Sequence, residues 1–150
     1  MTKTEKNKYI KKLYSAIEKV AQAHGYNLIA PIIAHAVICS EWGEAPLAAH
    51  NNIFGLHCSA KWTGDVVNHD TMKIYKPKKR TVIEKDYRAY KTLEQCIESY
   101  FIYLDSYMPR LKYAKSYKSL CKMIENYTNK KNYAIMLLEL IEEFKLEKYN

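Results

Sequence analysis

The chain has 150 residues, 48% of them hydrophobic, and this length suits one domain over residues 1–150. No segment approaches the roughly 20 apolar residues of a membrane span, and no apolar stretch follows the Lys-rich residues 1–12 as in a secretion signal, so we expect a chain that is cytoplasmic as synthesised. The formal net charge of +8 favours polyanions, including nucleic acid, anionic lipid and teichoic acid, without selecting among them.

Helical periodicity marks the first part of the chain. Apolar residues recur at helical spacing over 9–21, and Gly25 is a typical C-terminal cap. A second helix is expected to begin at Pro31 and to stop by Gly43. Because this segment is apolar on nearly every side, it should be the central buried helix.

The pattern changes between residues 51 and 90 to short β-branched and aromatic stretches at 66–67, 71–75 and 81–83. A basic run at 76–80, Lys-Pro-Lys-Lys-Arg, divides the last two. This predicts a small antiparallel hairpin with the basic run at its solvated tip, an interpretation that argues against nucleic acid as a partner. Helical periodicity returns at 93–107, 115–126 and 133–144.

Four cysteines, Cys39, Cys58, Cys96 and Cys121, are widely spaced and form no C-x-x-C pair. We therefore expect free thiols in a reducing compartment, with no metal site and no cofactor. The sequence indicates no oligomeric state.

Motifs spread over most of the chain occur in an order typical of a known family. They are 33–48, which contains Cys-Ser-Glu-Trp-Gly, then Asn-Asn-Ile-Phe-Gly-Leu at 51–56, Trp62 with Gly64, Thr71, Tyr-Arg-Ala-Tyr at 87–90, and the two-tyrosine segment 127–134. Over roughly residues 9–149 the chain resembles the peptidoglycan N-acetylglucosaminidases of glycoside hydrolase family 73. The resemblance implies a mostly helical α+β, lysozyme-like domain with a small β-hairpin lobe beside a groove for a peptidoglycan glycan strand.

The resemblance also implies a set of site residues. Tyr127 matches the tyrosine that lines the family's active site, whereas Cys39 stands where the family has its acidic glutamate, and Lys73 stands where the family often has a second carboxylate. Sugars present apolar ring faces and polar edges, so aromatic rings and amides suit a glycan. The expected substrate-binding residues are Trp42, Asn51, Asn52, Phe54, Trp62, Lys73 and Tyr133, with core packing as the alternative for the aromatic rings and a turn or helix cap for the asparagines.

Glycoside hydrolysis ordinarily uses two carboxyl groups, and a thiol is a poor proton donor to an ether oxygen. Glu41 and Glu44 are the candidate replacements for the acid, although Glu41 should point away from Cys39 because two residues rotate a helix by about 200°. Asp65, Asp70 and Glu84 are candidates for the second carboxylate.

Three functions therefore stay open. The domain hydrolyses peptidoglycan with relocated carboxylates, or it is a pseudoenzyme that binds glycan or a protein partner, or Cys39 is a nucleophile activated by His35 four residues earlier. A cell-wall role without a secretion signal would need release by phage lysis, a virion or a specialised secretion route.

Overall fold

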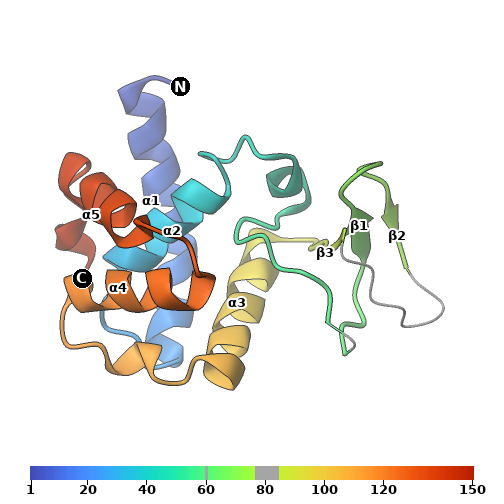
Figure 1. Ribbon diagram of the computed structural model, residues 1–150. Helices are drawn as coiled ribbons and strands as arrows, with labels where there is room; N and C mark the ends of the chain where they lie inside the picture. The colour runs from blue at the N-terminus through green and yellow to red at the C-terminus, as the bar shows by residue number, and fades with distance from the viewer. Residues whose placement is uncertain (60, 77–84) are drawn as a thin grey trace.

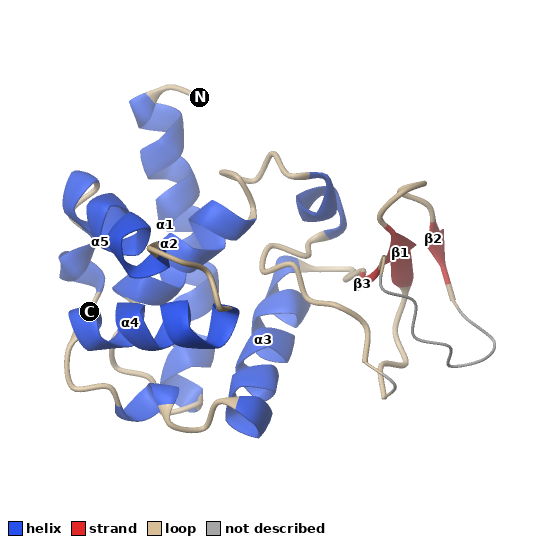
Figure 2. Ribbon diagram, in the orientation of Figure 1, coloured by secondary structure: helices blue, strands red, loops and turns tan. Residues whose placement is uncertain are grey.

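The computed structural model describes residues 1–59, 61–76 and 85–150. Figure 1 shows most of the helices on one side of the molecule and three short strands on the other, with one helix, α3, between them. The elements in chain order are α1 (Lys3–Ala23), α2 (Ala30–Cys39), η1 (Pro46–His50), β1 (Val66–Asn68), β2 (Ile74–Tyr75), β3 (Asp86–Arg88), α3 (Leu93–Tyr107), η2 (Leu111–Tyr113), α4 (Tyr117–Thr128), α5 (Tyr133–Glu143) and η3 (Leu146–Tyr149). The fold is thus mostly helical with a small sheet, as predicted (Figure 2).

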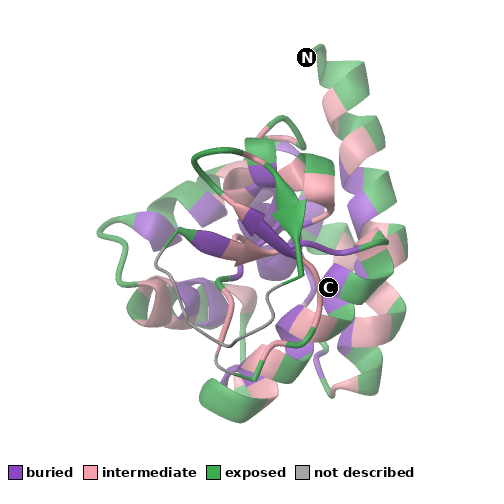
Figure 3. Ribbon diagram, turned by 90° about the vertical axis from the view of Figure 1, so that its right-hand side faces the viewer, coloured by how far each residue is buried: buried purple, intermediate pink, exposed green. Residues whose placement is uncertain are grey.

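Helix α1 begins with a capping box. The Thr2 hydroxyl accepts a hydrogen bond from the Glu5 backbone N–H, and the Glu5 carboxylate accepts one from the Thr2 N–H. One face of the helix is buried and the opposite face is exposed, and both classes of residue alternate along the helix that leaves the N-terminus in Figure 3. The chain then turns at Gly25, whose φ of +87° suits glycine, so the predicted cap is confirmed.

Helix α2 is the central buried helix that the sequence predicts. Every residue from Ala30 to Val37 is buried, with Pro31 in the first turn. The helix packs against α1, α4 and α5, and its side chains belong to the main hydrophobic cluster. It ends at Cys39, and Glu41, Trp42 and Gly43 all have positive φ, which turns the chain sharply away from the helix axis.

The sheet is antiparallel with the order β2-β1-β3. Val67 of β1 pairs with Ile74 of β2 on one side and with Tyr87 of β3 on the other. An antiparallel hairpin is present, formed by β1 and β2 around a turn at 69–73, where the Met72 N–H donates to the Asn68 carbonyl. Residues 71–73, predicted to be in a strand, therefore belong to this turn, and 74–75 form β2. The strand predicted at 81–83 and residues 77–80 of the basic run lie outside the described residues.

Two clusters of buried apolar residues hold these elements together. The larger gathers the helices around α2, and the smaller consists of Leu47, Val67 and Ala89 beneath the sheet. Within the described part of the chain, no helix combines the length and the apolar character that crossing a bilayer requires.

Candidate functional site

A cavity of about 600 Å³ opens between the helices and the sheet, within the size range of ligand pockets. Its walls come from six parts of the chain: α2, η1, the segment 54–59, β3, α3 and the end of α4 with the residues that follow it. The lining residues are His35, Cys39, Leu47, Phe54, Gly55, Leu56, His57, Cys58, Ser59, Tyr87, Arg88, Tyr100, Tyr103, Tyr107, Tyr127, Thr128 and Lys130. We refer to this space as the cavity.

A polar network forms the floor of the cavity. His35 Nδ1 lies 2.7 Å from the Tyr133 hydroxyl, and His35 Nε2 lies 3.3 Å from the Tyr127 hydroxyl. The Tyr127 hydroxyl is also 2.6 Å from the hydroxyl of Tyr100. Cys39 Sγ lies 3.5 Å from His35 Nδ1, so the cysteine and the histidine do share a helix face, as their spacing predicts.

The electrostatics of the floor favour uncharged groups. Burial, together with a smaller contribution from the nearby Lys130 cation, lowers the pKa of His35 to about 3. Burial raises the pKa of Cys39, although Lys130 and the Tyr133 hydroxyl oppose part of that rise. At neutral pH this predicts a neutral imidazole beside a neutral thiol, which is the opposite of the thiolate–imidazolium pair that an activated cysteine nucleophile needs.

Comparison with known proteins identifies the family to which the chain belongs. The family model described as mannosyl-glycoprotein endo-beta-N-acetylglucosaminidase matches residues 6–146. The chain belongs to this glucosaminidase family. The resemblance to glycoside hydrolase family 73 inferred from the motifs is therefore confirmed.

Individual relatives agree with this assignment. The chain is 29% identical over 129 residues to the exo-glucosaminidase LytG of Bacillus subtilis, a match that covers 79% of this chain and 44% of LytG. It therefore spans less than half the length of that curated relative. Among solved structures, the catalytic domain of the autolysin Auto from Listeria monocytogenes has a TM-score of 0.75 at 20% identity, covering 100% of this chain and 90% of that one. A glycoside hydrolase domain of Salmonella typhimurium FlgJ has a TM-score of 0.70 at 20% identity, covering 94% and 98%.

The position expected to carry the glucosaminidase acid is at the wall of the cavity. Cys39, the last residue of α2, lines the cavity and is half-buried. Glu41 and Glu44 are exposed and are not among the lining residues, because the left-handed turn after α2 directs the chain outward. Neither glutamate takes the place of Cys39 beside His35.

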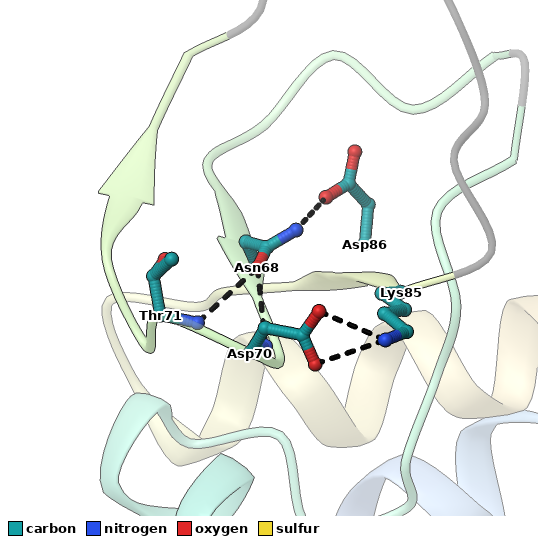
Figure 4. Close-up of polar contacts among 5 residues, drawn as sticks. All are labelled: Asn68, Asp70, Thr71, Lys85 and Asp86. Atoms are coloured by element: carbon teal, nitrogen blue, oxygen red, sulfur yellow. Dashed lines mark hydrogen bonds and ion pairs between the residues drawn. The ribbon is translucent and has the colours of Figure 1, made fainter.

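Two carboxylates near the hairpin, Asp70 and Asp86, are engaged with other protein groups (Figure 4). Asp70 lies in the β1–β2 turn and forms an exposed ion pair with Lys85 at 2.9 Å. Asp86, which the sequence reasoning did not consider, is buried and accepts hydrogen bonds from Tyr75 Oη at 2.5 Å and Asn68 Nδ2 at 3.3 Å. Lys73 is exposed and does not line the cavity, and Asp65 lines a separate small hollow. Glu84 lies outside the described residues.

The predicted asparagines hold the backbone together. Asn52 is 2% exposed, donates to the carbonyls of Leu56 and Arg88, and accepts from the Leu56 N–H. Asn51 has a φ of +60° and donates to the Tyr90 carbonyl. These contacts favour the turn interpretation for both residues and shape the segment that forms one wall of the cavity.

The predicted aromatic residues divide into those at the cavity and those elsewhere. Phe54 lines the cavity, and its ring stacks on Tyr100 with 3.8 Å between centroids. Tyr133 is buried directly behind the lining, where its hydroxyl contacts His35. Trp42 packs between Tyr9 and Phe144 away from the cavity.

Trp62 belongs to the same separate hollow as Asp65. Its indole N–H donates to the Asp65 carbonyl, and the Arg88 guanidinium lies over its ring. Trp62 thereby helps to fix Arg88, which does line the cavity. Trp62 does not itself line the cavity, and its contact with substrate stays a prediction.

Sequence reasoning missed three tyrosines of α3 that line the cavity, Tyr100, Tyr103 and Tyr107. The signal was present, because Tyr103 and Tyr107 follow Tyr100 by three and seven positions and so share its helix face. An apolar stripe at that spacing normally indicates core packing, which is why the exposed members were not recognised as a surface.

Proposed function

We propose that this glucosaminidase-family domain binds peptidoglycan glycan strands in the cavity and has lost the family's hydrolysis. The observation that carries the proposal is the composition of the cavity wall. Tyrosines and Phe54 supply flat apolar surfaces with polar tips, and the thiol of Cys39 stands at the expected acid position. Among the described lining residues the charged side chains are Arg88 and Lys130, and no carboxylate is present.

The chemistry of Cys39 supports binding over cleavage. A general acid works best when its pKa lies near the working pH, and it must donate a strong hydrogen bond to the leaving oxygen. Burial raises the pKa of the Cys39 thiol, and a thiol is a weak hydrogen-bond donor. The aromatic side chains of the cavity do not depend on the residue at position 39, so a cavity that lacks the acidic group still presents a wall suited to sugar rings.

The test is restoration of the acid by Cys39→Glu. Purified cell walls are incubated with wild type, Cys39→Glu and Cys39→Gln, and bound protein, turbidity and new reducing ends are measured. We expect the wild type to bind walls without releasing reducing ends, and Cys39→Glu to release them. Cys39→Gln is the matched control, because glutamine is nearly the same size as glutamate but has no acidic proton.

The same assay separates the alternatives. Reducing ends released by the wild type would contradict the proposal, and Glu41→Gln and Glu44→Gln would then show whether either glutamate acts as a relocated acid. Wall binding without hydrolysis by Cys39→Glu would direct attention to the second missing carboxylate. The double variant Cys39→Glu/Lys73→Glu tests that explanation.

A further inference from the structure

Helix α3 presents a row of tyrosines to the cavity. Tyr100, Tyr103 and Tyr107 all line it, and their spacing of three and four residues places them on one face of the helix. Exposure increases along the row: Tyr100 is 1% exposed, Tyr103 is half-buried and Tyr107 is 64% exposed. The row therefore runs from the floor of the cavity to its rim, over about 10 Å of helix axis.

The two outer tyrosines form a continuous surface. The ring centroids of Tyr103 and Tyr107 are 5.0 Å apart with an interplanar angle of 42°. At the floor, by contrast, the hydroxyl of Tyr100 is already bonded to Tyr127. Across the described residues, no side chain or backbone group forms a hydrogen bond with the hydroxyl of Tyr103 or Tyr107, so both phenols can serve a ligand.

The chemistry of this surface fits a saccharide. A pyranose ring offers an apolar face for stacking and hydroxyls at its edge, and a tyrosine offers a ring face and a polar tip. A row longer than a single pyranose ring suits an oligosaccharide that continues outward from Cys39. The described cations of the wall, Arg88 and Lys130, favour neutral or anionic glycans over cationic ones.

We propose that Tyr103 and Tyr107 form a distal glycan subsite, which binds saccharide units beyond those beside Cys39. The inference rests on the proposed function, since it assigns more of the same strand to the same cavity. Its consequence is that affinity rises with glycan length and that the increase depends on the two outer tyrosine rings.

The test compares a soluble peptidoglycan disaccharide with an octasaccharide by titration calorimetry. Wild type, Tyr107→Ala, Tyr103→Phe and Tyr107→Phe are measured beside Tyr113→Ala, a matched control at a tyrosine that is 76% exposed and lies outside the cavity. We expect Tyr107→Ala to weaken octasaccharide binding roughly five- to tenfold and to leave disaccharide binding unchanged. The phenylalanine variants should retain most of the affinity, and Tyr113→Ala all of it.

Two outcomes overturn the inference in distinguishable ways. If the wild type binds both glycans but Tyr107→Ala affects neither of them, or both equally, the distal subsite is wrong while the proposed function stands. If the wild type binds neither glycan, the proposed function fails and the subsite fails with it. Because Tyr107 is largely exposed, its alanine variant should unfold at the wild-type temperature, which checks that the fold is intact.

Discussion

Removing one hydroxyl from the floor of the cavity should destabilise the whole domain. Tyr133→Phe deletes the partner that lies 2.7 Å from His35 Nδ1, and His35 is only 3% exposed. Water does not readily replace the lost hydroxyl at a buried site, and Cys39 Sγ at 3.5 Å is a weak substitute because sulfur forms poor hydrogen bonds. A buried polar atom left without its partner costs about 1–3 kcal/mol.

That cost is large enough to measure by thermal unfolding. A destabilisation of 1 kcal/mol lowers the unfolding midpoint of a domain of this size by about 2–4 °C, so a loss near 2 kcal/mol predicts a decrease of about 4–8 °C. Circular dichroism during heating gives the midpoint. Tyr113→Phe is the control, because the hydroxyl of a tyrosine that is 76% exposed stays hydrated and its removal should change stability by less than about 0.5 kcal/mol.

The reasoning would be refuted by equal midpoints for Tyr133→Phe and the wild type. Such a result would mean that the His35 imidazole is satisfied without the phenol. The polar floor would then be a consequence of packing and would not contribute to the stability of the fold.

Two further predictions concern titration. Despite the opposing effect of partial burial, the pKa of His24 is raised, because hydrogen bonds with Asp105 and Glu98 outweigh that effect. Despite the opposing effect of burial, the pKa of Asp105 is lowered, because its bonds with His24 and Lys112 outweigh that effect. The histidine's contribution is complete below about pH 6.5 and is lost as pH rises through its folded pKa, whereas that of Asp105 is complete above about pH 4 and is lost on acidification. The free energy of unfolding should therefore fall between pH 5.5 and 8.5 by more in the wild type than in His24→Gln, and parallel losses would contradict this. For Cys39, burial raises the pKa, so in a Cys58→Ser background the rate of thiol labelling should still be increasing above pH 9; a plateau below pH 8 would instead support the nucleophile hypothesis.

The helices could be predicted because local signals define them. The segment expected at 93–107 is α3 to the residue, and Thr92 caps it as a side-chain acceptor. The sheet was harder to predict from the sequence. Strand β3 has three residues and pairs with β1 across about twenty positions, and no local sequence pattern indicates such a contact. The turn that follows Asn68 was also missed, because the alternation of residue types does not show where a strand ends.

Part of the site could be predicted from the spacing of residues along a helix and from the family motifs. Cys39 and His35 lie on one face of α2, as their spacing predicts, and Phe54 and Tyr127, both named from the sequence, line the cavity. Trp42 was expected at the substrate, but the positive φ values that follow α2 direct its ring to the other side, against Phe144, and no sequence periodicity indicates such a turn.

Helix α2 lies in the middle of the hydrophobic core and also carries Cys39 at the wall of the cavity. The residues that stabilise the fold and the residues that line the cavity therefore belong to the same helix. We expect the loss of a methyl group from Ile33 to displace Cys39 Sγ, because closely packed interiors transmit strain. The strands pack on a separate small cluster, and β3 also lines the cavity through Tyr87 and Arg88. We therefore expect substitutions to be tolerated most readily in the exposed strand β2, and least in α2, where the same helix serves both folding and the cavity.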